Sequence, residues 1–242
     1  MKELKTEYFK DTVIESESYY DYFVQLVRSE QRKIKLSVDY SKFDVNTPFT
    51  EYFKTFDCLY VEDGWQIGCY YFHSSTAGNP VIYIQKADED INDLLSRIDN
   101  KGFMYDHRIF EYCETVKTTD HLKINDFTKG LFQLLILDII GANFALYWHA
   151  GYGRVQIICS KRDLDKLLFD HDVDADKRSE IKKLNELPSI EETNEAITFK
   201  LLMFNAWSGL KEKTYSIKKE FPHKISMVSE KLLVEYHCEI MF

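Results

Sequence analysis

The sequence predicts an α+β fold, in which a mixed, mainly antiparallel sheet with β-hairpins packs around a buried central helix at about 126–140 and several shorter helices. The central segment is apolar on nearly every side, which is typical of a helix that is buried on most sides. Short runs of alternating apolar residues recur along the chain and indicate half-buried strands. Helical and strand patterns do not alternate in a regular βαβ order, which argues against a doubly wound α/β fold.

Near the N-terminus, a helical pattern is followed by an alternating one. Ser18 is a suitable N-cap, and the apolar residues after it recur at helical spacing, so we expect a helix over about 18–31. The next segment, 33–40 (KIKLSVDY), alternates apolar and polar residues and therefore predicts a strand.

A β-hairpin is predicted over 57–72 (DCLYVEDGWQIGCYYF). Asp63-Gly64 is a preferred pair for a two-residue type I′ turn, and strand-forming runs lie on both sides of it. This register makes Cys58 and Cys69 direct cross-strand neighbours, close enough for a disulfide. Either the two thiols pack together on one face of the sheet, or they form a redox switch.

Capping residues, apolar spacing and alternation predict the remaining elements. We expect a strand at 80–85, a helix capped by Asp88 or Asp90, a strand within 103–116, a hairpin joining 144–149 to 154–160, helices starting after Ser160 and at about 175, and strands at 197–204, 214–221 and 232–242. The whole chain, 1–242, is expected to form one domain, and a weak boundary near Pro188 is the alternative.

The composition disfavours several classes of protein. The net charge is −9 and no long run of Lys or Arg occurs, which argues against direct nucleic acid binding. The most apolar stretch, 127–148, is interrupted by polar residues, so we expect no membrane span. The five cysteines form no CxxC pair and the chain starts without an apolar signal region, so we expect a cytoplasmic protein with no cofactor and no metal site.

Four aspartates alternate in the segment DHDVDADK: Asp170, Asp172, Asp174 and Asp176. A calcium loop of the EF-hand type needs Gly at its sixth position and Glu at its twelfth. Counted from Asp170, these positions hold Ala175 and Ile181, so we expect a polar joint between two helices rather than a calcium site. The aspartates could also contact a cationic partner.

Candidate catalytic residues lie around the segment 148–154 (WHAGYGR). Its two glycines suit a hairpin turn, whereas a phosphate-binding loop would lead into a helix. If the turn lines a cleft, His149 could act as a general base and Arg154 as an anion clamp, and His73 is a third candidate.

Two classes of function remain open. The first is an acidic protein-binding module, with Tyr70, Tyr71 and the four aspartates as candidate contact residues. An immunity protein or inhibitor that neutralises a basic partner protein has this kind of composition. The second is an enzyme with a cleft near the 148–154 turn. The sequence does not predict the oligomeric state.

Overall fold

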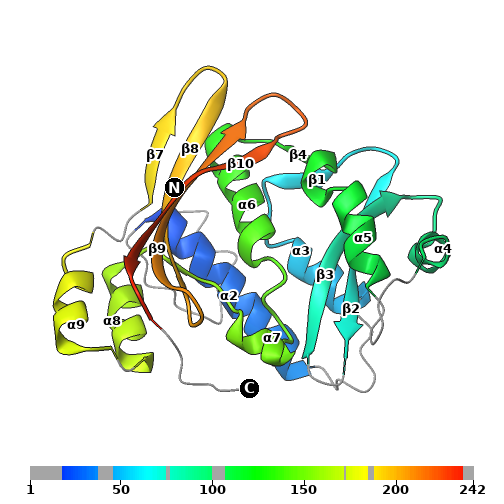
Figure 1. Cartoon of the computed structure of the whole chain (residues 1–242). Coiled ribbons are helices and arrows are strands. Elements are labelled where there is room, and N and C mark those ends of the chain that lie inside the picture. The colour runs from blue at the N-terminus through cyan, green and yellow to red at the C-terminus, as the bar shows by residue number, and fades with distance from the viewer. Residues whose placement is uncertain are drawn as a thin grey trace.

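The computed structural model describes residues 18–37, 46–74, 77–99, 107–171, 173–184 and 188–236. The helices labelled in Figure 1 are α2 (Tyr19–Ser37), α3 (Asn46–Phe53), α4 (Ile91–Ser96), α5 (Arg108–Thr115), α6 (Phe127–Ile140), α7 (His149–Tyr152), α8 (Lys161–Asp170) and α9 (Ala175–Ile181). The strands are β1 (Leu59–Val61), β2 (Trp65–His73), β3 (Ala77–Lys86), β4 (Leu122–Ile124), β5 (Tyr147–Trp148), β6 (Gln156–Ile158), β7 (Ser189–Glu192), β8 (Ala196–Asn205), β9 (Gly209–Lys218) and β10 (Ile225–Val234).

These strands form three antiparallel sheets, and together with the helices they confirm the predicted α+β fold. The largest sheet has the order β10-β9-β8-β6, and β7 pairs with β8 beyond the stretch that pairs with β6. A second sheet has the order β2-β3-β5, and β1 pairs with β4. In Figure 1, α6 lies between the large sheet on the left and the three-stranded sheet on the right.

The core is centred on α6, as the sequence predicts. Nine of its fourteen residues are buried, whereas Phe127, Lys129 and Asp138 are exposed. The main apolar cluster joins α6 to α2 through Phe23, to β1 through Leu59, to β2 through Cys69 and to β8 through Phe199. Packing partners on so many sides explain why this segment is apolar all round.

The predicted strand at 33–40 is wrong over 33–37, because α2 continues to Ser37. Residues 38–40 lie outside the described part of the chain. Ile34 is buried in the main apolar cluster and follows Val27 by seven residues, which places both on one helix face. A short alternating run does not exclude a helix when one of its apolar residues continues the buried face.

The predicted hairpin at 57–72 is wrong in its pairing. β1 pairs with β4, and β2 pairs with β3. Cys69 therefore lies opposite Ile82 and not opposite Cys58, and both thiols are free.

The tight turn inside that segment does form, but it does not have the predicted type. The Trp65 N–H donates to the Glu62 carbonyl at 3.0 Å, which closes a four-residue turn. Gly64 has a φ of +83°, whereas Asp63 does not have a positive φ. A type I′ turn needs positive φ at both central residues, so this turn does not align the two strands as a hairpin.

Two further strand predictions are wrong. In place of the strand within 103–116, the structure has α5, on which Ile109 and Tyr112 are buried three residues apart; residues 103–106 lie outside the described part. In place of a hairpin over 144–160, β5 pairs with β3 and β6 pairs with β8. The turn between β5 and β6 contains α7, so this segment connects two different sheets.

The other expected elements are present, with some changes of length. Asp90 caps α4, Asp126 caps α6 and Ser160 caps α8, each by accepting a hydrogen bond from a backbone N–H. The last strand begins earlier than predicted, at Ile225, and ends at Val234. Residues 237–242 of the predicted strand lie outside the described part.

Candidate functional site

Side chains from two other helices cap the C-terminal end of α6. Gln31 of α2 donates from Nε2 to the Ile140 carbonyl at 2.6 Å, and the Tyr52 hydroxyl of α3 donates to the Gly141 carbonyl at 2.9 Å. Both side chains are buried. They satisfy carbonyls that the end of a helix otherwise leaves unpaired, and they fix the following loop against α2.

The loop after α6 turns sharply at Ala145. This buried residue has a φ of +47°, in the left-handed region that alanine rarely adopts. The Tyr71 hydroxyl of β2 donates to the Ala145 carbonyl at 2.8 Å, and the Asn143 amide donates to the Val155 carbonyl at 3.2 Å. A backbone strain of roughly 1–3 kcal/mol persists only where surrounding contacts impose it, and these bonds supply such contacts.

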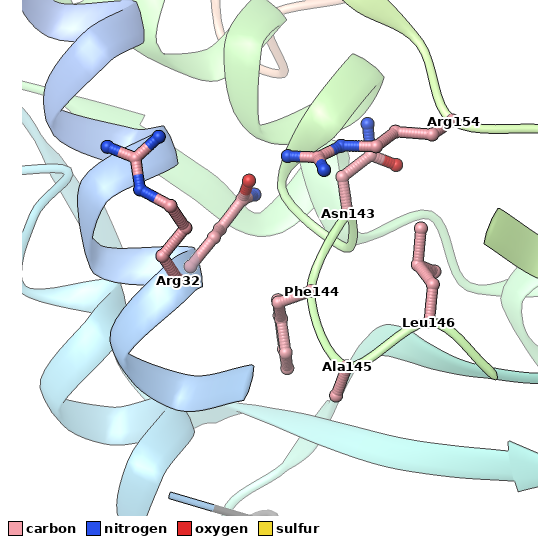
Figure 2. Close-up of a pocket in the computed structure, with 7 residues that line it drawn as sticks. Arg32, Asn143, Phe144, Ala145, Leu146 and Arg154 are labelled. Atoms are coloured by element: carbon pink, nitrogen blue, oxygen red, sulfur yellow. The ribbon is translucent and has the colours of Figure 1, made fainter. Parts of the chain in front are cut away.

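A pocket of about 40 Å³ lies between α2 and this loop. Its lining is Gln31, Arg32, Asn143, Phe144, Ala145, Leu146 and Arg154. Figure 2 shows Arg32 extending from α2 and Arg154 extending toward α2 from the segment after α7. A water molecule needs roughly 10–15 Å³ of such space, and a metabolite site usually has roughly 300–1,000 Å³. The pocket therefore fits a few waters or one small polyatomic group.

Three arginines gather on this side of α2, and only one of them has a carboxylate partner among the described residues. Arg28 donates to the buried Asp163 carboxylate at 2.9 Å and to the Ile157 carbonyl at 2.5 Å. Arg32 and Arg154 form no ion pair with any carboxylate in the described ranges. The pocket is thus lined by two positive charges that no carboxylate of the described ranges neutralises.

The electrostatics of Arg154 reflect this crowding. Desolvation, followed by the positive charges of Arg28 and Arg32, lowers the pKa of the Arg154 guanidinium. A guanidinium remains protonated at any physiological pH, so Arg154 stays charged despite its lowered pKa.

The lining suits binding of an anion better than catalysis. Its polar groups are two guanidinium groups and two side-chain amides, and none of the seven lining residues is a carboxylic acid, a thiol or an imidazole. Proton transfer needs a group whose pKa lies near the working pH. The lining residues hold no such group.

Of the three predicted catalytic residues, Arg154 lines the pocket, and His149 is not among the described residues that line it. His149 is the first residue of α7 and follows β5. His73 is the last residue of β2, and its side chain lies outside what the structure describes. In the three-stranded sheet, Gly78 of the central strand β3 pairs with His73 of β2 on one side and with Tyr147 of β5 on the other. The fold therefore brings these segments to the same end of the three-stranded sheet.

The aspartate run lies at the joint between α8 and α9. Asp170 ends α8, Asp174 precedes α9 as its N-cap residue, and Asp176 lies in the first turn of α9. Asp172 lies outside the described part. Within the described ranges, no group of three or more His, Cys, Asp or Glu side chains could hold a metal ion.

The charge around this joint is balanced. Between Lys161 and Lys183 the sequence has seven acidic and seven basic residues. Asp170 pairs with Lys166 at 2.8 Å. The sequence around the run therefore carries no net charge, and contact with a cationic partner stays a prediction.

The two tyrosines that were expected to contact a partner are half-buried. Tyr71 hydrogen-bonds to Ala145, as described above, and packs against the main apolar cluster. Tyr70 packs against the apolar cluster beneath α4 and α5. Tyr60, on the neighbouring β1, is 49% exposed. Partner contact by Tyr70 and Tyr71 also stays a prediction.

Sequence reasoning missed a group of exposed apolar side chains on β10. Met227, Val228 and Leu232 are 56%, 63% and 50% exposed. β10 ends the large sheet and pairs only with β9 among the described strands. Met227 lies opposite Tyr215 and Leu232 opposite Lys211, so both share one face, and Val228 lies at a bulge between them. The segment lacks strict alternation, so no strand was expected over its first seven residues.

Among the described helices, none is both long enough and apolar enough to cross a membrane. Comparison with models of protein families, with curated proteins and with solved structures finds no match for this chain.

Proposed function

We propose that the protein is a protein-binding module that binds an extended segment of a basic partner protein along β10. The observation that carries this proposal is an edge strand with three exposed apolar side chains, Met227, Val228 and Leu232. The outer edge of such a strand offers backbone N–H and C=O groups to a further strand. In β-strand addition, main-chain hydrogen bonds give affinity and alternate side chains give specificity.

The charged residues of β10 support this use of the strand. Glu230 lies between Lys211 and Lys213, at 2.6 Å and 2.8 Å. Hydrogen bonds from these two lysines lower the pKa of Glu230 to about 2, so the carboxylate stays ionised and paired. The cluster fixes a polar group between Met227 and Leu232 without adding a net negative charge to the strand.

The charge distribution favours a basic partner. Residues 46–124 carry thirteen acidic and seven basic residues and so hold most of the net charge of −9. The β9–β10 loop borders this half of the molecule, because the Lys123 ammonium of β4 lies 5.5 Å from the centre of the Phe221 ring. A basic protein on β10 would therefore also face the acidic half, and opposite charge speeds association.

Binding of this kind would inhibit the partner if the bound segment belongs to its working surface. This is the class of immunity protein or inhibitor that the acidic composition led us to expect. The alternative function, catalysis near 148–154, gains no support from the geometry. The expected hairpin turn is α7, and the adjacent pocket is small and has no acid–base group among the described residues of its lining.

The test is affinity capture from lysate of the source cells, followed by titration of the purified partner. Val228→Asp and Leu232→Asp place a carboxylate on the proposed contact surface, and each should weaken binding at least tenfold, as loss of an interface hot spot does. Phe169→Ser is the matched control, since Phe169 is 90% exposed on α8. Unchanged melting temperatures would show that the variants fold.

Two results would contradict the proposal. In the first, the β10 variants bind the purified partner as tightly as the wild type does, or Phe169→Ser alone loses binding. In the second, light scattering after size exclusion shows a dimer that Val228→Asp dissociates, which would mean that a second copy of the chain occupies β10.

A further inference from the structure

We propose that the pocket between α2 and the 143–146 loop binds a phosphate group through Arg32 and Arg154. This inference does not depend on the proposed function, because the residues of the pocket and of β10 are different.

The positive charges around the pocket favour binding of an anion. Asp163 compensates Arg28, but Arg32 lies one helical turn further along α2 and has no carboxylate partner in the described ranges. Arg154 faces the same space from the other side, as Figure 2 shows. The chain contains 40 acidic residues, yet none that is described lies where it would neutralise this pair. The positive charges of Arg28 and Arg32 act on the Arg154 guanidinium. Like charges repel each other, and a bound anion would reduce that repulsion.

The number of charges favours a doubly charged oxyanion such as phosphate over a carboxylate. A phosphate monoester carries about −1.5 to −2 charges at pH 7, which matches two guanidinium groups, whereas a carboxylate matches only one. The planar guanidinium also binds phosphate oxygens in a bidentate manner. The pocket volume of about 40 Å³ fits the phosphate group itself. The remainder of a larger ligand would stay outside.

The walls of the pocket are held in place before any ligand binds. Gln31 lines the pocket and hydrogen-bonds to the end of α6. The strained Ala145 is fixed by the Tyr71 hydroxyl, and Asn143 is fixed by the Val155 carbonyl. Backbone strain of this kind concentrates at ligand sites, and a fixed wall lowers the entropy lost on binding.

The experiment is thermal unfolding in sodium phosphate, acetate and chloride at equal ionic strength, with isothermal titration calorimetry using inorganic phosphate. At ten times the Kd, a specific ligand should raise the melting temperature of a chain this size by about 3 °C. Phosphate also stabilises proteins generally, because it is excluded from their surface. Comparison with variants of the pocket separates this general effect from binding at the site. Arg32→Gln and Arg154→Gln should each abolish the rise in melting temperature that comes from phosphate binding at the pocket. Arg97→Gln, on the C-cap residue of α4, should keep it.

A second readout is the direction in which each substitution changes the melting temperature in the absence of phosphate. Removing one of two repelling charges should leave the melting temperature in chloride unchanged or higher for Arg32→Gln and Arg154→Gln. A clear decrease would show that these arginines have structural partners and would overturn the proposal. The proposal also fails if acetate matches phosphate, or if both variants keep the phosphate increment.

A third comparison identifies the source of the phosphate. Glycerol phosphate that binds more tightly than inorganic phosphate would indicate a phosphate group on a larger molecule. Equal or weaker binding of the ester would indicate the free ion. Either result supports the site, and absence of binding by both contradicts it.

Discussion

At the scale of single residues, one polar side chain organises the apolar core. Gln133 is fully buried on α6. Its Oε1 accepts from the Cys58 N–H at 2.9 Å, and its Nε2 donates to the Asp57 carboxylate at 2.6 Å and to the Tyr19 hydroxyl at 3.0 Å. Because every hydrogen-bonding group of the amide has a partner, Gln133 fixes α6 against both α2 and the chain before β1.

Replacing this residue should therefore destabilise the protein. Gln133→Leu leaves the buried Cys58 N–H without an acceptor, which should lower the free energy of unfolding by roughly 1–3 kcal/mol. Urea denaturation measures the loss. The control is Gln66→Leu, on an exposed position of β2, which should change stability by less than about 0.5 kcal/mol. Equal effects of the two substitutions would show that the Gln133 hydrogen bonds contribute nothing measurable.

At the scale of elements, the helices were more predictable than the strand pairings. Ser160 and Asp126 mark helix starts because capping is local, within three residues of the cap. Pairing is not local: Leu59 of β1 lies opposite Ile124 of β4, which is far along the chain. The Asp63-Gly64 pair indicated a turn correctly, but it did not determine which strands would pair.

The candidate sites were predictable to a similar degree. Arg154 could be named from the sequence because an arginine beside a glycine turn is a local signal, and it lines the pocket. Its role stays a prediction. Its neighbour Arg32 lies on α2, more than a hundred residues earlier, and no spacing in the sequence connects the two. The exposed side chains of β10 were missed because edge position depends on the order of strands in the finished sheet.

The β8–β9 connection gives a test at this scale. Gly209 has a φ of +79°, and a Cβ there would lie 2.2 Å from the Val234 carbonyl oxygen. Gly209→Ala should lower the free energy of unfolding by roughly 1–3 kcal/mol. Gly151→Ala, in α7, meets nothing within 4 Å and should be neutral or slightly stabilising. A neutral Gly209→Ala would contradict the described β8–β9–β10 geometry.

At the scale of the whole molecule, charge is unevenly distributed. The excess of acidic residues lies in 46–124 and not in the aspartate run, whose surroundings are neutral. Association with a basic partner should therefore depend on the electrostatic field of the acidic segment 46–124. Between 50 and 300 mM NaCl, the association rate constant of the purified partner should fall severalfold while the dissociation rate changes little. Surface plasmon resonance separates the two rates. A salt-independent association rate would argue against a basic partner.

Hydrogen–deuterium exchange of the complex with the purified partner tests most directly whether β10 is the contact strand. A partner strand added to the edge with which no described strand pairs would hydrogen-bond to outward backbone N–H groups of β10. We predict slower exchange in peptides covering 225–234 when the partner is bound, and unchanged exchange in peptides covering the α8–α9 joint. Unchanged exchange in β10 together with protection at the joint would contradict the account and would identify the aspartates as the binding surface.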